Sequence, residues 1–290
     1  MRITLVTHYY PPEVNAPAQR AFDHARFWTQ AGCKVTILTA QPSHPYGRVY
    51  DGYANATSEE VVDGVRIVRL KTVLGANSGR VRRSMNYASF LQAVYANAWR
   101  ARDADVVIST SPQFFCGLSG RAVAAAAHAP WVLEIRDVWP ESIIAVGAAK
   151  PSLATSALSA LADIAYSQCD RIISVSPGFA RHFRDRGVPD EKVSLVPNGI
   201  DFSADLKQAS FDDFPALASL RGRTIAAYVG TLGMAHGVST ILEAAAHLKE
   251  NKRLGFLLVG SGAERNALIA KRDALGLDNI VIQIGRASCR

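Results

Sequence analysis

The sequence has few cysteines and no long apolar run, and these two absences exclude several protein classes. It holds four cysteines in 290 residues, and none are spaced as C-x-x-C, so neither a disulfide framework nor a cysteine-based zinc site is expected. Cys33, Cys116 and Cys169 lie in apolar or helical stretches, where reduced cysteine commonly fills core space. No run approaches the ~20 apolar residues that span a bilayer, and the N-terminus lacks a signal peptide's apolar region. We therefore predict a cytoplasmic protein.

The chain carries an excess of positive charge. Lys and Arg total 32 against 25 Asp and Glu, a net charge of +7, within a composition typical of a soluble globular protein. This excess favours anionic partners such as sugar nucleotides, lipid phosphates or a membrane surface. No recognition motif supports a nucleic-acid partner. A short basic run, Arg80, Arg82 and Arg83, is either a solvated helix face or a contact to lipid phosphate.

The first two thirds of the chain alternate between strand and helix patterns. Helical spacing over residues 16–31, 87–101 and 153–167, and a Ser176-Pro177 helix start, predicts crossovers between parallel strands. Asp63-Gly64 between two apolar runs predicts a hairpin. The first strand–helix turn lacks G-x-G-x-x-G, which disfavours a nicotinamide or flavin enzyme. The predicted strands cover residues 3–7, 35–39, 106–110, 131–135, 171–175 and 193–196.

A second α/β series follows a polar, irregular stretch. Its predicted strands are 225–229, 256–259 and 279–284, and glycine-rich turns at 230–237 and 260–262 precede predicted helices. Amide groups at helix N-termini favour anions. We predict an N-terminal domain over residues 1–200, a linker over 201–222 and a partial second domain over 223–290.

The stretch 131–142 is the centre of the functional prediction. An apolar strand with one internal carboxylate, Glu134, runs into Arg136, Asp137 and Glu141. Ligands of doubly wound folds bind at the carboxyl ends of the strands. These charges are therefore either a solvated salt-bridge cluster or part of a ligand site. Residues 109–113 end another strand with hydroxyls and Gln113, which suit a phosphate, a sugar hydroxyl or a helix cap.

Several motifs together resemble the retaining GT-B glycosyltransferases of family 4. The closest resemblance is to the branch that builds bacterial surface polysaccharides, including the aminosugar transferases of O-antigen and capsule assembly. Such enzymes have two Rossmann-like domains facing across a cleft, with the acceptor on the first and the nucleotide sugar on the second. The motifs lie, in the family's order, at residues 8–20, 110–115, 134–142, 175–177 and 196–201.

The resemblance assigns roles to particular residues. Asp137 would stabilise charge at the anomeric carbon, with Arg136 and Glu141 beside it as further catalytic candidates. His8, Tyr9 and Gln113 would lie on the acceptor side. No metal ion and no cofactor other than the donor substrate are implied. The donor and its phosphates would contact Asn15, Arg20, Asn198, Gly230, Thr231, Gly233 and His236.

The sequence departs from the family pattern at three of these places. Asn15 and Ala16 replace paired glycines, Arg136-Asp137 replaces a His-Asp-like pair, and Thr231 and His236 replace Arg and Lys. The resemblance also implies a longer second domain, so we expect a C-terminally truncated chain. Residues 284–290 match one reading frame of a common sequencing adapter and are expected to be foreign.

The predicted activity is transfer of a sugar from a nucleotide sugar to a polyprenyl-pyrophosphate-linked acceptor, with peripheral contact to the inner leaflet. Two alternatives remain at this point. One is a GT-B nucleotide-sugar epimerase that needs no acceptor. The other is an inactive, truncated binding fragment.

Overall fold

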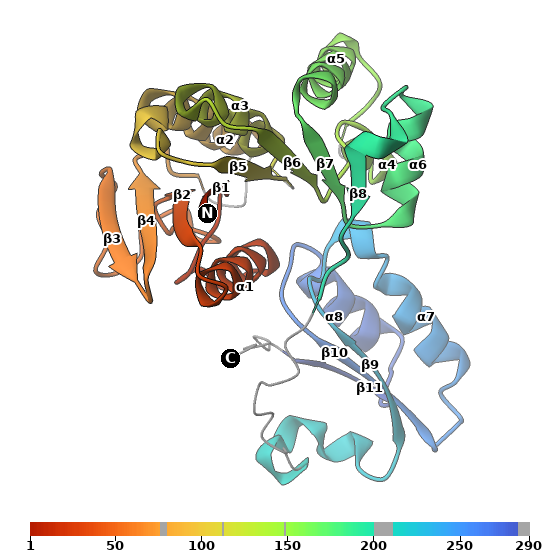
Figure 1. The fold of residues 1–290 in the computed structure, drawn as a ribbon. Helices are drawn as coiled ribbons and strands as arrows, with labels where there is room; N and C mark the ends of the chain where they lie inside the picture. Colours follow the sequence, from red (N-terminus) through yellow and green to blue (C-terminus); the bar gives the residue numbers. More distant parts are fainter. Residues whose placement is uncertain (76–79, 112, 148, 200–210, 284–290) are drawn as a thin grey trace. The chain divides into compact units, whose positions relative to one another are not determined.

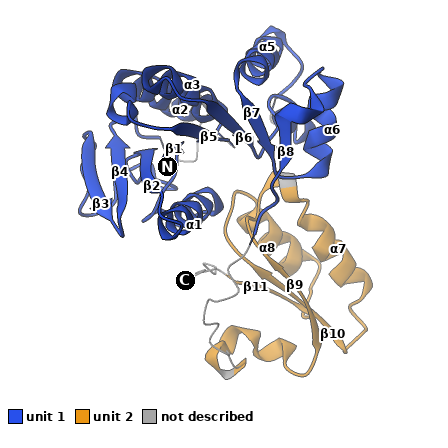
Figure 2. Ribbon diagram, viewed as in Figure 1, with its two compact units in different colours: residues 1–199 blue, residues 200–290 orange. Residues whose placement is uncertain are grey.

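The chain forms two compact units, Met1–Gly199 and Ile200–Arg290, in a computed structural model that describes residues 1–75, 80–111, 113–147, 149–199 and 211–283 (Figures 1 and 2). Each unit has its own mainly or wholly parallel sheet and its own helices. Both sheets therefore confirm the predicted α/β class.

Unit 1 is built on an eight-stranded sheet in the order β3-β4-β2-β1-β5-β6-β7-β8. All neighbours are parallel except β3 and β4, which form the predicted hairpin. Asp63 and Gly64 both have positive φ, at 50° and 79°, as a tight hairpin turn requires. The strands are β1 (Arg2–Val6), β2 (Lys34–Ala40), β3 (Ser58–Val62), β4 (Val65–Leu70), β5 (Val106–Thr110), β6 (Trp131–Ile135), β7 (Arg171–Ser174) and β8 (Val193–Leu195).

The direction of each crossover decides which face its helix covers. The β1–α1–β2 crossover moves toward the β3 edge of the sheet, whereas the β4–α2–β5 and β5–α3–β6 crossovers move toward the β8 edge. Because such connections are right-handed, α1 lies on the face of the sheet opposite to α2 and α3. Figure 1 shows this arrangement. The helices are α1 (Ala16–Gln30), α2 (Arg80–Asn97), η1 (Ala98–Ala101), α3 (Phe114–Ala127), α4 (Glu141–Ala145), α5 (Leu153–Gln168), α6 (Pro177–Asp185) and η2 (Asp190–Lys192).

Helix α2 begins at Arg80, earlier than the predicted start at residue 87. The first turns of the helix bury none of residues 82–85. The sequence there therefore lacks the repeated apolar positions from which a helix is predicted. The basic run is thus helical, and Arg82 and Arg83 are exposed on it, while the Arg80 side chain lies outside the described part.

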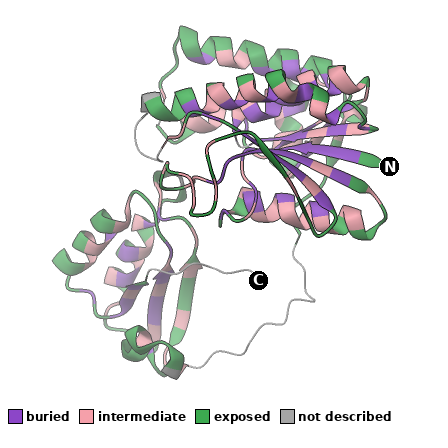
Figure 3. Cartoon of the chain, turned by 90° about the vertical axis from the view of Figure 1, so that its left-hand side faces the viewer, coloured by how far each residue is buried: buried purple, intermediate pink, exposed green. Residues whose placement is uncertain are grey.

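Two apolar cores fill unit 1, one on each face of the sheet. Phe90 and Val94 of α2 pack with Cys116, Leu133 and other side chains on one face. On the other face, Ala21 and Ala25 of α1 pack against Leu5, Ile37 and Ile67. The central strands are accordingly buried (Figure 3). Cys116 and Cys169 are buried core residues, as predicted.

Unit 2 holds a three-stranded parallel sheet in the order β11-β10-β9. Leu220 is fully buried, so the end of the predicted linker packs as part of unit 2. Residues 200–210 of the linker region lie outside the described residues. The elements are η3 (Phe211–Asp213), η4 (Pro215–Leu220), β9 (Thr224–Val229), η5 (Met234–His236), α7 (Ser239–His247), β10 (Leu254–Val259), α8 (Arg265–Ala274) and β11 (Ile280–Gln283). In the portion described, no helix is long and apolar enough to cross a membrane.

Candidate active site

A buried ion pair lies at the carboxyl end of β6. Glu134 is 5% exposed, and its Oε1 accepts hydrogen bonds from Arg20 of α1, through Nη2 and, at 3.0 Å, through Nε. Thr110 donates to the other oxygen, Oε2, at 2.6 Å. The third nitrogen of Arg20, Nη1, donates to Asn198 Oδ1 at 2.8 Å. A desolvated pair is stable only with such additional hydrogen bonds, so the two side chains hold each other in a fixed geometry.

Ser111 fixes the loop that follows this strand. Its amide donates to the Glu134 carbonyl at 3.0 Å, and its Oγ accepts from the amides of Arg136 at 2.7 Å and Asp137 at 3.3 Å. Partial loss of solvent raises the pKa of Asp137, and the neighbouring Arg136 charge opposes the rise. Burial has the opposite effect on the neighbouring base and lowers the pKa of Arg136. The predicted catalytic pair Arg136-Asp137 therefore sits on a constrained loop at a strand end.

A cavity of about 220 Å³ opens beside the ion pair, lined by Arg20, His24, Thr110, Glu134 and Arg136 together with apolar side chains of the sheet. His24 lies one helical turn after Arg20 and stacks on Trp28, with ring centroids 5.1 Å apart. Burial, and then the Arg20 charge, lower the pKa of His24. Two guanidinium groups and a neutral imidazole suit a ligand rich in oxygen.

His8 and Tyr9 follow β1 and lie among aromatic rings. His8 is 5% exposed, its ring is 4.6 Å from that of Phe90, and burial lowers its pKa to about 4. Burial raises the pKa of Tyr9, whose ring is 4.7 Å from that of His8. Both groups are therefore neutral at neutral pH and act as hydrogen-bonding rather than charged groups.

Glu13 is a buried acid close to them in the chain. Its Oε1 accepts from the amides of Ser43, at 3.0 Å, and His44, at 2.8 Å, while Oε2 is buried with no partner among the described residues. Burial raises its pKa to about 7, although the amides of His44 and Ser43 oppose the rise. The carboxyl group thus ties the loop after β2 to the loop after β1.

Asn15 and Gln113 act as helix caps. Asn15 Oδ1 accepts from the Ala18 amide at 2.9 Å at the start of α1, and Gln113 Oε1 accepts from the Cys116 amide at the start of α3. In each case the side-chain amide nitrogen is buried without a partner in the part of the chain described. Capping accounts for one atom of each side chain, and the nitrogen is left as a donor for a ligand.

Glu141 has a different environment. Arg186 donates to its Oε1, and the same guanidinium pairs with Asp163 at 2.5 Å, which ties α4 to α5 and to the end of α6. This ion pair accounts for one carboxylate oxygen of Glu141; the other, Oε2, is buried with no partner among the described residues.

The glycine turns of unit 2 pack against each other. The Gly230 amide donates to the Val259 carbonyl at 2.9 Å, so the expectation that this amide is free for a phosphate is corrected. A Cβ on Gly260 would lie 1.8 Å from the Gly230 carbonyl oxygen, and one on Gly262 would lie 2.2 Å from the Leu232 carbonyl oxygen. Close backbone packing therefore requires these glycines. Thr231 and His236 are exposed in the same turn, and the Gly233 carbonyl accepts from the His236 amide at 3.0 Å.

One pair of acids with Asp-x-Asp spacing, Asp103 and Asp105, precedes β5, although the sequence prediction of no metal ion assumed that no such pair is present. Asp105 accepts from Arg2 Nε at 3.0 Å and from the Arg2 amide at 2.7 Å. These acids lie at the amino ends of the strands, away from the site, and Asp105 is accounted for by its ion pair.

His24 was not considered in the sequence prediction, whereas Glu134, Thr110, Ser111 and Glu13 lay within its motifs without individual roles. Two signals were available. A single acid inside an apolar strand, such as Glu134, requires a partner. The i, i+4 spacing of Arg20 and His24 puts them on one helix face. No local pattern indicated that Glu13 would be buried.

Comparison with known proteins identifies the fold and family of this site. The family model described as "Glycosyl transferase 4-like domain" matches residues 15–199. The chain belongs to this family. It is a glycosyltransferase with a GT-B-type fold, and the match contains every residue of the ion pair and of the Asp137 loop.

Individual sequences and solved structures resemble this chain. The chain is 22% identical over 289 residues, 97% of its own length and 70% of the relative's, to the Escherichia coli K12 protein named "Putative colanic acid biosynthesis glycosyl transferase WcaI". The solved sucrose-phosphate synthase of Thermosynechococcus elongatus aligns with a TM-score of 0.69 at 18% identity, covering 99% of this chain and 71% of that one. Anabaena HepE in complex with UDP aligns with a TM-score of 0.60 at 14% identity, covering 98% and 70%.

Proposed function

We propose that this glycosyltransferase moves a sugar from a nucleotide-sugar donor to a lipid-linked saccharide acceptor in surface polysaccharide synthesis, with retention at the anomeric carbon. The observation that carries the proposal is the position of Asp137: Ser111 Oγ accepts from the backbone amides of Arg136 and Asp137 and so holds this loop at the end of β6. In the reaction, the bond between the anomeric carbon and the donor phosphate oxygen breaks. The acceptor hydroxyl oxygen bonds to that carbon, its proton passes to the leaving phosphate, and nucleoside diphosphate is released.

Asp137 stabilises the positive charge that develops at the anomeric carbon, an electrostatic role for which a preorganised carboxylate suffices. The Arg136 charge opposes the rise in the pKa of the Asp137 carboxyl that burial causes. The Arg20–Glu134 pair positions the loop; Arg20 has five N–H donors, and its three bonds to Glu134 and Asn198 leave two for a phosphate. His8, Tyr9 and Gln113 contact the acceptor.

Donor recognition is supported by the relatives. HepE was crystallised with UDP, and the name of WcaI refers to colanic acid biosynthesis. In this chain, Asn15 and Asn198 of unit 1, and Thr231, Gly233 and His236 of unit 2, are the proposed donor contacts. Because the Gly230 amide is already bonded, Gly230 contributes only shape.

Asp137→Asn tests the chemistry. Purified chain is incubated with UDP-, ADP- and GDP-sugars and a bacterial lipid extract, and labelled sugar is counted in the organic phase. We expect the variant to lose at least ~100-fold of the transfer rate, the typical loss for one electrostatic group, while binding donor as the wild type does. NMR of the product's anomeric centre tests retention. Equal rates for both proteins would refute the role of Asp137.

The same assay separates the alternatives. An epimerase converts the donor without any acceptor, and a binding fragment binds nucleotide without turnover. The epimerase is not favoured, because the family model and the relative WcaI are described as glycosyltransferases.

Membrane contact is the last part of the proposal. Arg82 and Arg83 are exposed at the start of α2, where they contact lipid phosphate on the cytoplasmic leaflet. Replacing both with alanine should reduce sedimentation with phosphatidylglycerol vesicles, whereas replacing the exposed Lys150 and Arg181 should not. Equal sedimentation of both variants would exclude a specific contact by α2.

A further inference from the structure

A second, larger cavity lies in unit 1 between α1 and the β3–β4 hairpin. It has a volume of about 480 Å³, within the roughly 300–1,000 Å³ of ordinary ligand sites. We call it the hairpin groove. Its floor is made by Glu60 and Val62 of β3 and Val65, Ile67 and Arg69 of β4, its wall by Phe22, Arg26, Thr29 and Gln30 of α1, and its end by Tyr10, Pro11, Pro12 and Tyr53.

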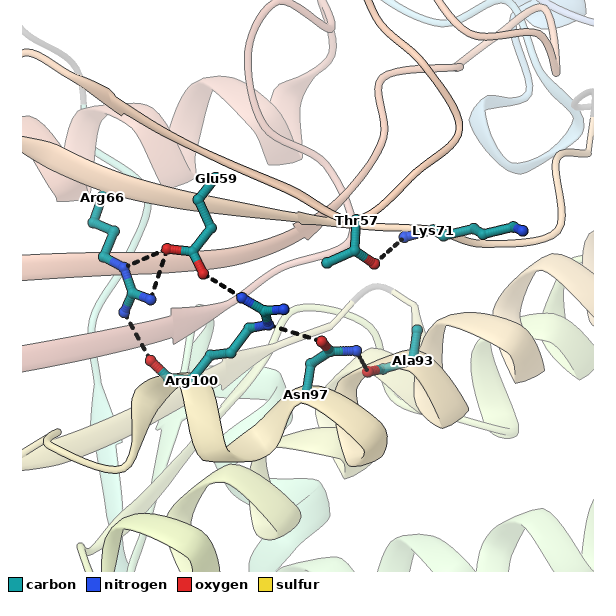
Figure 4. Close-up of polar contacts among 7 residues, drawn as sticks. All are labelled: Thr57, Glu59, Arg66, Lys71, Ala93, Asn97 and Arg100. Atoms are coloured by element: carbon teal, nitrogen blue, oxygen red, sulfur yellow. Dashed lines mark hydrogen bonds and ion pairs between the residues drawn. The ribbon is translucent and has the colours of Figure 1, made fainter.

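The opposite face of the hairpin is held by a polar network (Figure 4). Arg66 Nη2 donates to Glu59 at 2.8 Å, Arg66 Nη1 donates to the Arg100 carbonyl at 2.7 Å, and Arg100 also pairs with Glu59. Because side chains alternate along a strand, Glu60 and Val62 face the other way, into the groove. The network anchors one face of the hairpin; on the other face Val65 and Ile67 pack in the core beside α1, and Glu60 and Val62 border the groove.

Arg69 is a buried guanidinium in the groove floor. It is 2% exposed; its Nε donates to Glu60 at 2.6 Å and its Nη2 to the Pro11 carbonyl at 2.6 Å. Its Cζ lies 5.1 Å from the centre of the Tyr53 ring. The remaining nitrogen, Nη1, is buried and has no partner within the described residues. Buried donors are normally paired, so this unmet donor points to an oxygen-rich ligand.

The lining combines ring faces with hydrogen-bonding groups. Tyr10, Phe22 and Tyr53 supply aromatic surface, and the carboxylates, amide and hydroxyl around them supply polar atoms. The two arginines of the lining are matched by two acids, Glu60 and Asp63, so the groove has no net charge to attract a polyphosphate. A sugar ring matches this lining, because it has an apolar C–H face and a rim of hydroxyls.

We propose that the hairpin groove binds a saccharide segment of the acceptor, away from its reacting hydroxyl. This inference rests on the proposed function. Tyr10 and Pro11, which line the groove, follow the proposed acceptor residues His8 and Tyr9 directly in the chain. The groove then selects acceptors by the sugars already attached to them.

Val62→Trp tests the proposal by filling the groove. Val62 is 45% exposed and faces the groove, whereas Val61 is 71% exposed on the opposite face, so Val61→Trp is a matched control. The full chain, each variant and Asp137→Asn are applied to a microbial glycan array and to an extended-peptide library. We expect glycan binding by the wild type, at least a tenfold loss in Val62→Trp, and unchanged binding in Val61→Trp and Asp137→Asn.

Three results would overturn the proposal: no glycan bound by the wild type, equal binding by Val62→Trp, or binding of peptides in place of glycans. Circular dichroism confirms that both tryptophan variants fold. The outcome is independent of the transfer assay. Glycan binding sensitive to position 62 without any transfer would remove the enzymatic role alone, and transfer sensitive to Asp137 without groove binding would remove the groove alone.

Discussion

The strand ends of the two units present different kinds of chemical group. In unit 1 they carry charged side chains, such as Glu134 and Asp137: the Glu134 carboxylate accepts from Thr110, and the backbone amide of Asp137 donates to Ser111. In unit 2 they carry glycines whose backbones touch, so that the Gly230 carbonyl occupies the space a Gly260 side chain would need. Unit 1 thus presents charged side chains at its strand ends, whereas close backbone packing shapes the turns of unit 2. The predictions below test this difference.

The largest effect is expected from breaking the buried pair. Arg20→Met leaves Glu134 as a buried charge, and removal of one partner of such a pair costs about 3–5 kcal/mol. Urea unfolding gives the free energy of unfolding. In the double variant Arg20→Met, Glu134→Leu no charge is left unpaired, so most of the stability should return. A loss below about 1 kcal/mol in the single variant would mean that solvent reaches the pair.

Gly260→Ala tests whether close backbone packing stabilises unit 2. A Cβ at 1.8 Å from a backbone oxygen forces the two turns apart, and we expect a loss above about 3 kcal/mol, at the upper end of overpacking effects. Gly237→Ala is the control, because Gly237 has a φ of 56° but no atom within 4 Å of its Cβ position, and it should lose only about 1–2 kcal/mol. Hydrogen exchange of β9 and β10 reports the result. Equal losses would show that backbone conformation, not close approach, requires the glycines.

Much of the fold follows from the sequence, because its elements obey local rules. The Asp63-Gly64 turn, the Ser176 cap and the apolar strands were each predicted from nearby residues and are present. The start of α2 was missed because its exposed first turns have no apolar period. The burial of Leu220 was missed because it depends on contacts with distant residues in the sheet of unit 2.

The site was less predictable than the fold. The strand end that carries Asp137 was recognisable from its charges, but the partners of those charges come from far along the chain. Arg20 and Glu134 are 114 residues apart, and Glu13 and His44 are 31 apart. The glycine-rich turns were ambiguous in the sequence, because the same residues suit an anion loop and a tight backbone contact. The structure shows the tight contact at Gly260 and Gly262.

Glu13→Gln should produce a pH-dependent gain in stability in unit 1. The folded pKa of about 7 lies above the ordinary value of 4.5, so the folded state keeps a proton that the unfolded state has lost between these values. Wild-type stability therefore falls as pH rises through this window. Glutamine keeps the acceptor for Ser43 and His44, so the variant should match the wild type near pH 4.5 and exceed it by about 1–3 kcal/mol above pH 7. Asp51→Asn, which removes the same charge at an exposed position, should show no such difference.

The smallest effect is expected from substitution of His236, a side chain in a turn of unit 2. It is exposed, so His236→Ala should change the free energy of unfolding by less than about 0.5 kcal/mol. If it contacts the donor phosphate, loss of one hydrogen bond weakens UDP binding about 3- to 10-fold, measured by calorimetry.

His247→Ala is the matched control for this measurement, because it removes the same side chain from the far end of α7, where it is also exposed. A loss confined to His236→Ala would add a side chain to the recognition surface of unit 2 and weaken the contrast with unit 1. Equal affinity in both variants would leave backbone groups such as the Gly233 amide as the remaining phosphate contacts of that turn, and the contrast would hold.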